Sequence, residues 1–249
     1  MNTINTRRTI RKYTQDDVSE SLLDRLLSAA SRTQTMGNLQ LYSVVVTRDA
    51  EMKALLAPSH FDQPMVKNAP VVLTICADFR RVTDWCANRR ADAGYDNFLS
   101  FINAATDALL FTQTFCCLAE EEGLGCCFLG TTVYMPQQII DTLKLPRLVM
   151  PVATITLGWP DETPPLTDRL PTGSFVHRET YQPYTPERID TFYREKESLP
   201  ENQEFVRVNG KQTLAQVFTD CRYTRSDNES MSAGLLAALR HQGFLPEEP

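Results

Sequence analysis

The longest run of helical periodicity in the chain, residues 97–122, places the strongest constraint on its fold. Apolar and small side chains recur there every three or four positions, beginning with Phe98 and Ile102, which predicts an amphipathic helix. Gly123 follows directly and supplies a C-terminal stop. The apolar run at 109–111 widens the apolar arc beyond the stripe of a surface helix. We therefore expect a helix that is central in the fold or lies at a subunit interface.

Several segments rich in apolar and β-branched residues predict a sheet. Residues 70–77 are so continuously apolar that we expect a strand buried on both faces. Further extended segments are predicted at 42–47, 125–130 and 152–158, and further helices at 17–33, 136–143 and around 232–240. Strands separated by helices indicate an α/β or α+β fold.

The character of the chain changes after Pro160. Six prolines between positions 160 and 186 punctuate a stretch that we expect to be mostly loop. A polar segment, 187–212, then leads to the final helix. We predict one domain, with a core over residues 1–186 and, in the same domain, a C-terminal excursion and terminal helix over residues 187–249.

The composition excludes several classes of protein. Hydrophobic residues make up 42% of the 249 residues and charged residues 22%, values typical of globular proteins with a core of normal size. The formal net charge of −6 argues against a nucleic-acid-binding protein, which needs a basic field. The N-terminus lacks the apolar segment of a secretory signal, and no apolar run reaches the ~20 residues of a membrane span. We therefore expect a cytoplasmic protein with neither membrane nor nucleic acid as a partner.

The cysteines, histidines and glycines argue against other common kinds of site. Seven cysteines, with adjacent pairs at 116–117 and 126–127, fit reduced and buried small hydrophobes better than a disulfide framework. The three histidines are far apart and show no metal-ligand spacing, so we predict no metal site. Gly123 and Gly125 follow a helix rather than a strand, and Gly130 comes too late for a dinucleotide-binding fingerprint. A Rossmann domain is therefore not supported.

A basic segment near the N-terminus is the strongest candidate for a binding site. Residues 7–13 read Arg-Arg-Thr-Ile-Arg-Lys-Tyr, so three arginines fall within five positions of an acidic chain. Such a segment could be a solvated start of the chain. The apolar Ile10 and Tyr13 indicate instead that it packs down, and Arg169 adds a guanidinium in a proline-flanked loop. Because guanidinium groups bind phosphate in a bidentate way, the segment predicts an anion site.

Four features, in order along the chain, carry a family resemblance. They are the basic segment 7–13, the sequence from Ala30 to Gln40, the glycines of 123–130, and the segment that runs from Leu157-Gly158-Trp159-Pro160 to Arg169-Leu170-Pro171. Over residues 5–185 this pattern resembles the FMN-dependent nitroreductase / flavin reductase superfamily. It is most similar to the NADPH-dependent, oxygen-insensitive nitroreductase branch.

The resemblance implies an α+β sandwich in which helices flank a mixed, mainly antiparallel sheet. It implies an intertwined homodimer with two FMN sites at the subunit interface, so that the helix at 97–122 would lie in the dimer core. It also implies two alternating half-reactions, in which FMN accepts hydride from NADPH or NADH and then reduces a small-molecule electron acceptor such as a nitroaromatic, a quinone or free flavin. No side chain is expected to be an obligatory catalytic group.

The resemblance places three arginines and a threonine of the basic segment at the cofactor. Arg7, together with Arg169, would hold the FMN phosphate, and Thr9 would add a hydroxyl hydrogen bond. Arg8 belongs to the same cofactor-binding segment, with a mainly structural role. Arg11 would lie near the N1/O2 edge of the isoalloxazine ring, where a positive charge stabilises the anionic reduced flavin.

Two further segments and one amide complete the predicted FMN site. Gln63 resembles the amide that hydrogen-bonds the pyrimidine edge of the ring. Three residues of one subunit match the segment that passes the ribityl chain and phosphate: Thr35, Met36 and Gly37. Three others match the backbone that lies against the ring face near N5: Leu129, Gly130 and Thr131.

Alternatives to the reductase interpretation remain open. The same fold and cofactor also serve other FMN chemistry, such as enone reduction or flavin breakdown. A flavin-binding storage or sensor protein with negligible turnover would carry the same site. A flavin-free interaction domain would require the arginines to be solvent-exposed residues without a ligand. The sequence leaves both NADPH and NADH open as the electron donor.

Overall fold

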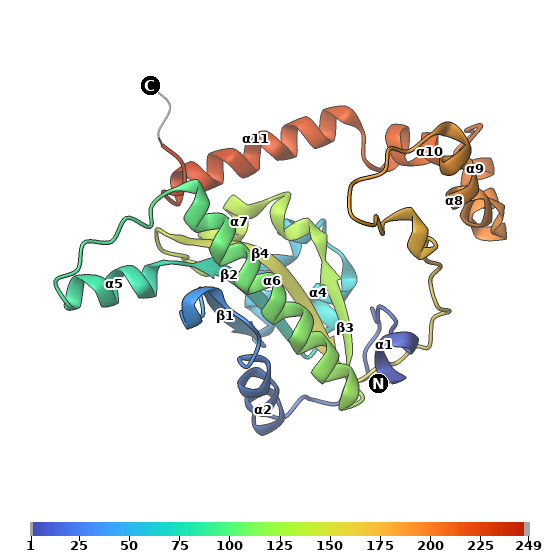
Figure 1. Ribbon diagram of the computed structural model, residues 1–249. Helices are drawn as coiled ribbons and strands as arrows, with labels where there is room; N and C mark the ends of the chain where they lie inside the picture. Colours follow the sequence, from blue (N-terminus) through green and yellow to red (C-terminus); the bar gives the residue numbers. More distant parts are fainter. Residues whose placement is uncertain (1, 247–249) are drawn as a thin grey trace. The chain divides into compact units, whose positions relative to one another are not determined.

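A four-stranded sheet forms the centre of the larger part of the chain (Figure 1). The computed structural model describes residues 2–246. The strands are β1 (Tyr42–Thr47), β2 (Val71–Asp78), β3 (Gly125–Leu129) and β4 (Val149–Gly158), in the order β1-β2-β4-β3. All three neighbouring pairs are antiparallel. The structure confirms the predicted α+β class, and the four strands fall at the four predicted extended segments.

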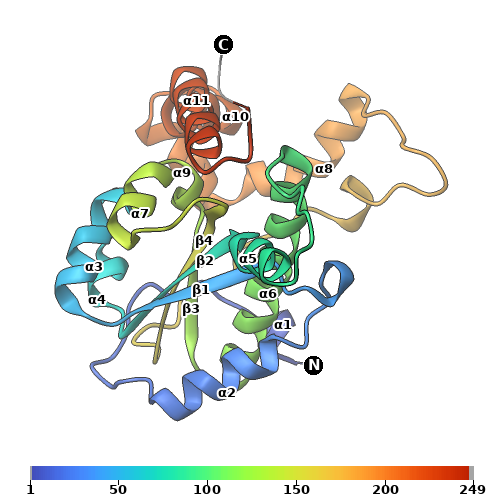
Figure 2. The same ribbon diagram turned by 90° about the vertical axis from the view of Figure 1, so that its left-hand side faces the viewer.

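Helices cover both faces of the sheet, as Figure 2 shows. One face carries the 24-residue helix α6 (Phe98–Glu121), and α2 (Glu20–Ala30) packs beside α6. The other face carries α3 (Ala50–Leu56), α4 (Pro64–Asn68) and α7 (Pro136–Leu143). Because the sheet is covered on both sides, the buried apolar side chains form two clusters, one on each face. The helices predicted at 17–33, 97–122 and 136–143 are confirmed as α2, α6 and α7.

The two-residue period of the strands sorts their side chains between the two clusters. In β3, Cys126 packs in the cluster under α6, whereas Cys127 and Leu129 pack in the cluster on the opposite face. Cys116 on α6 is buried as well, and Cys117 is half-buried. All seven cysteines are free thiols. The adjacent cysteine pairs therefore contribute mainly small apolar side chains to the core, as predicted.

The helix α6 has one buried and one exposed apolar side. Phe115 is fully buried against the sheet, while Leu99 and Leu110 on the other side are 68% and 45% exposed. By length and composition alone, α6 is long and apolar enough to cross a membrane. It packs against all four strands, as the core helix of a globular protein does. Its exposed leucines leave an apolar stripe on the surface of the single chain.

Several helices lie outside the predicted segments. They are α3 and α4 on the sheet, together with α1 (Asn2–Thr6), α5 (Arg80–Asn88), α8 (Pro186–Ser198), α9 (Pro200–Val208) and α10 (Leu214–Val217). Local signals start α8: the Thr185 side chain accepts a hydrogen bond from the Arg188 N–H, and Pro186 takes the first helical position. Hydrophobic periodicity does not indicate α8 or α9, because neither helix buries a side chain fully.

The chain divides into two compact units. The first contains the residues up to Pro165 together with those from Met231 onward, and the second is Leu166–Ser230. The helix α11 (Arg225–His241) begins in the second unit, ends in the first, and contains the predicted terminal helix. The division of one domain at residues 186 and 187 stays a prediction.

Candidate functional site

The basic segment packs on the edge of the sheet, as its apolar residues predict. The Ile10 N–H donates to the Cys126 carbonyl at 3.1 Å, and the Tyr13 hydroxyl lies 2.7 Å from the Thr156 hydroxyl. Ile10 and Tyr13 are each only 7% exposed. A Cβ at Gly125 would lie 2.7 Å from Ile10, so the segment approaches β3 as closely as it does because this position is glycine. The segment is therefore held in place rather than frayed.

The first two arginines of the segment have partners within the chain. Arg7 forms an ion pair of 3.2 Å with Glu120 at the end of α6, and burial raises the pKa of that carboxyl group above its usual range. Arg8 donates to the Pro164 carbonyl at 2.7 Å and to the Thr6 carbonyl at 2.8 Å. A structural part for Arg8 agrees with these bonds. Binding of the FMN phosphate by Arg7 stays a prediction, as does the hydroxyl bond from Thr9.

Arg11 projects from the same segment toward the opposite cluster. Its side chain is exposed, and its charge partly offsets the burial that raises the pKa of the Cys127 thiol. The Arg11 and Lys12 N–H groups both donate to Glu162 Oε1, at 2.6 and 3.1 Å. The backbone of Arg11 is thus fixed, while its guanidinium remains at the surface.

Gln63 follows a tight turn that presents its side chain. The turn is the short helix η2 (Ala57–His60), after which Phe61 and Asp62 take left-handed backbone angles, with φ of 55° and 52°. Gln63 is half-buried, and its carboxamide forms no hydrogen bond with any of residues 2–246. A half-buried amide without a partner is available to a ligand.

The backbone beyond β3 is open to a ligand at Gly130. The short helix η3 (Gly130–Val133) begins there, and the Thr132 hydroxyl fixes it by donating to the Leu129 carbonyl at 2.8 Å. A Cβ built at Gly130 would have no atom within 4 Å. Thr131 is half-buried, and its hydroxyl oxygen lies 2.8 Å from Nδ1 of His60.

The structure places these predicted residues around β3. The short helix η2 contacts η3 and is bonded to it through His60 and Thr131, and Gln63 follows η2 by three residues. The Arg11 charge acts on Cys127 of β3. The cluster joins a cation, an amide and an open stretch of backbone. Such a set can bind a planar ligand with a polar edge that carries negative charge.

The predicted segment Thr35–Gly37 is attached to α6 instead. It enters the short helix η1 (Met36–Asn38), in which Gly37 has a φ of 55°. The carboxylate of Asp107 on α6 accepts hydrogen bonds from the N–H groups of Met36 at 2.9 Å and Leu41 at 3.1 Å. The Asp107 carboxylate thereby anchors the loop on α6.

Arg169 lies in the second unit. Its guanidinium donates to the hydroxyl of Thr167 at 2.7 Å and to the Asp168 carbonyl at 2.8 Å, and the side chain is exposed. The short local bonds hold the loop and leave other N–H groups of the guanidinium free to bind elsewhere. Its role in phosphate binding stays a prediction.

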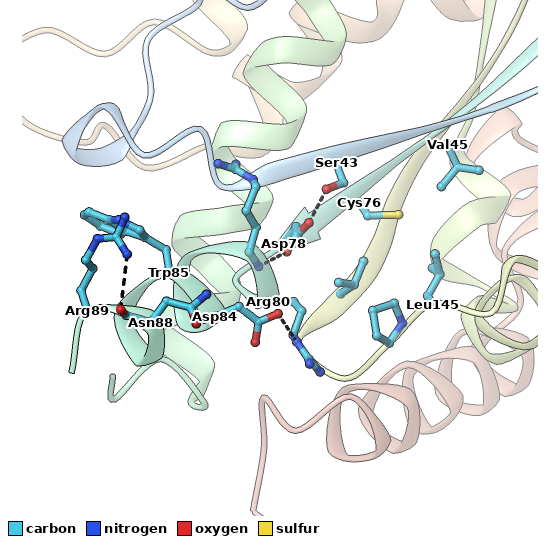
Figure 3. A pocket seen from close by; sticks show the side chains of 13 residues that line it. Ser43, Val45, Cys76, Asp78, Arg80, Asp84, Trp85, Asn88, Arg89 and Leu145 are labelled. Carbon is cyan, nitrogen blue, oxygen red and sulfur yellow. Dashed lines mark hydrogen bonds and ion pairs between the residues drawn. The ribbon is translucent and has the colours of Figure 1, made fainter. Parts of the chain in front are cut away.

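A pocket of about 670 Å³ opens elsewhere in the first unit, between α5 and the β1–β2 part of the sheet (Figure 3). Three of its charged groups bond within the protein: Arg80 bonds Asp84 at 2.8 Å, and Asp78 accepts from the Ser43 hydroxyl and the Arg81 N–H. None of the predicted cofactor-binding residues lines it. The carboxylates of Asp78 and Asp84 are thus satisfied without a ligand.

Sequence reasoning missed two buried polar residues that support the site, Asp107 and His60. A lone carboxylate on the buried side of a strongly apolar helix is a signal that could have revealed Asp107. His60 was weighed only as a metal ligand, and its neighbours in the sequence contain no pattern that pairs it with Thr131.

Comparison with known proteins identifies the family. The model of the Nitroreductase family matches residues 4–159 of the chain. The chain belongs to the Nitroreductase family. Two relatives in this family are the FMN reductase [NAD(P)H] of Bacillus subtilis strain 168, which is 31% identical over 83% of each chain, and the oxygen-insensitive NADPH nitroreductase of Salmonella typhimurium, which is 30% identical over 71% of this chain and 72% of its own. The resemblance read from the sequence is confirmed.

Solved structures agree with the assignment to the Nitroreductase family. A crystal structure from Bacteroides fragilis NCTC 9343 covers 98% of this chain and 100% of its own, with 59% identity and a TM-score of 0.97. The structure of NfrA2 from B. megaterium covers 99% and 98%, with 29% identity and a TM-score of 0.85. The similarity to these solved structures therefore extends over almost the whole chain, beyond the residues that the family model matches.

Proposed function

We propose that this Nitroreductase-family chain is an FMN-dependent oxidoreductase that uses NADPH or NADH to reduce small electron acceptors such as nitroaromatics, quinones or free flavins. The observation that carries the proposal is the placement of Arg11, Gln63 and Leu129–Thr131 around β3. The Arg11 charge acts on Cys127, and the turn that leads to Gln63 is bonded to Thr131 through His60. An exposed guanidinium, an unpaired amide and a stretch of backbone open at Gly130 fit the polar edge and the flat face of an isoalloxazine ring. The names of the relatives, an FMN reductase and an NADPH nitroreductase, support the same activity.

The residues of the cluster have distinct parts in the proposed mechanism. Bound FMN supplies hydride acceptance from the nicotinamide and transfer of the electrons to the second substrate. Arg11 places a positive charge at the ring edge and so favours negative charge on the ligand beside it. Gln63 orients the pyrimidine edge through its amide, and the absence of a side chain at Gly130 lets the backbone approach the ring face. No step needs a protein nucleophile or a metal ligand.

A second copy of this chain is the proposed partner. The exposed apolar stripe on α6 includes Leu99, Ile102, Leu109 and Leu110, whose side chains are 43–68% exposed. An apolar stripe of this kind is typical of an interface between subunits. The segment Thr35–Gly37 is bonded to α6 rather than to β3, which fits a site whose two halves come from two copies. Sedimentation is expected to give twice the chain mass of 28.2 kDa.

The visible absorption spectrum of the purified protein tests the proposed activity. The protein is expected to show flavin bands, as isolated or after addition of FMN, and anaerobic NADPH or NADH is expected to bleach them. The nucleotide that bleaches faster is the preferred donor. A protein that fails to take up FMN contradicts the proposal. Flavin bands that neither nucleotide bleaches would favour a storage or sensor protein instead. Turnover of enones, with no turnover of nitroaromatics, quinones or flavins, would favour enone reduction as the activity.

Two neighbouring variants test the part of Arg11. Arg11→Ala is expected to weaken FMN binding by about 10- to 100-fold, because a hydrogen bond to a charged group contributes about 1.5–3 kcal/mol. Lys12→Ala removes the same charge one position along and is expected to change the dissociation constant by less than about twofold, because an exposed charge contributes little. Fluorescence titration of FMN measures both. Equal losses in the two variants would mean that general charge rather than the Arg11 contact binds the ligand.

A further inference from the structure

The buried side chain of His60 links the two segments that form the proposed ring site. His60 is 0% exposed, closes η2 three residues before Gln63, and has its Nδ1 atom 2.8 Å from the Thr131 hydroxyl oxygen in η3. We infer that His60 is a positioning residue: its Nδ1–H donates to Thr131 and thereby leaves the Thr131 hydroxyl proton to donate to the bound flavin. This inference rests on the proposed function.

The surroundings of the other ring nitrogen decide the tautomer of His60. Nε2 is buried and has no hydrogen-bond partner within residues 2–246. A buried N–H without a partner costs more than a buried lone pair without one, and orphaned N–H groups are the rarer of the two. The neutral ring therefore carries its proton on Nδ1, and this proton can reach only the Thr131 oxygen. Burial also lowers the pKa of His60 to about 4, so the ring is neutral at physiological pH.

The direction of this bond determines what Thr131 can do. A hydroxyl has one proton and two lone pairs, so an oxygen that accepts from His60 still has its own proton to donate. Among the described residues, 2–246, the Thr131 hydroxyl has no second partner to accept it. Thr131 is half-buried beside the open backbone at Gly130. Its free donor is therefore available to the ring nitrogen and carbonyl acceptors of an isoalloxazine placed against Leu129–Thr131.

His60 also fixes the spacing between the two halves of the cluster. The Nδ1–Thr131 bond joins η2, which leads to Gln63, to η3, which begins at Gly130. The two segments also share the apolar cluster that contains Ala57 and Leu129, so removal of the bond is expected to loosen the spacing between the Gln63 amide and the Leu129–Thr131 backbone without separating the segments. His60 acts through Thr131 and Gln63 and does not itself contact the ligand.

The tautomer can be measured in the protein without FMN. Two-dimensional ¹H–¹⁵N NMR of the imidazole side chains is expected to show a protonated Nδ1 and an unprotonated Nε2 for His60 at neutral pH. A His60→Asn variant identifies the signals. A protonated Nε2 in the wild-type protein would overturn the inference, whatever the protein does with FMN.

Variants at the two positions test the link to the flavin. Thr131→Val removes the hydroxyl at nearly constant volume and is expected to weaken FMN binding about 5- to 10-fold and to shift the visible absorption band of bound FMN. Thr131→Ser keeps the hydroxyl and is expected to restore both. His60→Leu is expected to show the same two effects as Thr131→Val, and the double variant is expected to be no weaker than either single variant.

The outcomes separate this inference from the proposed function. A wild-type protein without affinity for FMN contradicts the proposed function and the flavin part of the inference. The tautomer measurement still determines the direction of the hydrogen bond between His60 and Thr131. If the wild-type protein binds FMN and Thr131→Val has the same affinity and spectrum, the inference is wrong and the proposed function stands. Thermal unfolding of each variant identifies any loss of fold, and His60→Asn, which retains an N–H near the Nδ1 position, is the substitute if His60→Leu does not fold.

Discussion

Replacement of Asp107 with alanine is expected to lower the free energy of unfolding by about 3 kcal/mol. Asp107 is 1% exposed, and its two carboxylate oxygens accept hydrogen bonds from the N–H groups of Met36 and Leu41. The variant leaves two N–H groups without a charged acceptor and releases a loop with left-handed angles at Gly37 and Asn38. The midpoint of urea-induced unfolding, monitored by circular dichroism, measures the effect.

Two companion variants make the Asp107 result specific. Asp107→Asn keeps one oxygen acceptor and is expected to cost less than alanine does. Asp92→Ala removes an exposed carboxylate from the loop after α5 and is expected to change the unfolding free energy by less than about 0.5 kcal/mol. Equal midpoints for Asp107→Ala and Asp92→Ala would mean that the loop needs no anchor on α6.

Acidification from pH 6.5 to pH 4 is expected to remove about 3 kcal/mol of stability through His60 alone. Burial lowers the pKa of this ring from 6.5 to about 4 in the folded chain. Between these two values the unfolded chain binds the proton and the folded chain does not, so the unfolded state binds more protons and stability falls as the pH falls. The contribution is fully present above the unfolded pKa and is lost as the pH approaches the folded one.

The contribution of His60 can be isolated by difference. His60→Asn does not titrate in this range, so its stability is expected to fall less steeply than that of the wild-type protein. His241→Asn changes an exposed histidine and is expected to follow the wild-type curve. The buried carboxyl group of Glu120 has a raised pKa and acts in the opposite direction, since the folded chain binds its proton first. Parallel curves for His60→Asn and the wild-type protein would contradict the prediction.

The sheet and the long helix could be predicted because the side chains that they bury follow a regular pattern in the local sequence. β2 is buried at every position and reads as an unbroken apolar run, and α6 repeats apolar residues over six turns. Helices with little burial, such as α8 and α9, carry no such pattern, so their polar sequence predicts no helix by periodicity. Local chemistry at their ends, such as Pro186 after Thr185, was the available signal.

The residues of the candidate site could be predicted from the sequence, but the contacts that fix them in space could not. The resemblance points to Arg11, Gln63 and Leu129–Thr131, and the fold links the segments that contain them to β3 through Cys127 and the His60–Thr131 bond. The partners that fix them come from distant parts of the chain, as with His60 for Thr131, and no spacing rule links such positions. The ion pair between Arg7 and Glu120 was missed for the same reason, because it joins residues 113 positions apart.

The basic segment also has a bearing on solubility. β3 is an edge strand of the sheet, and an exposed edge offers unpaired backbone groups to a strand of another molecule. The Ile10 N–H donates a hydrogen bond to the Cys126 carbonyl on that edge. Charged residues at positions 7, 8, 11 and 12 flank Ile10 in the sequence. Irregular backbone with clustered like charges cannot template the addition of a further strand. The residues proposed to serve the ligand thus also protect the folded chain from edge-to-edge aggregation.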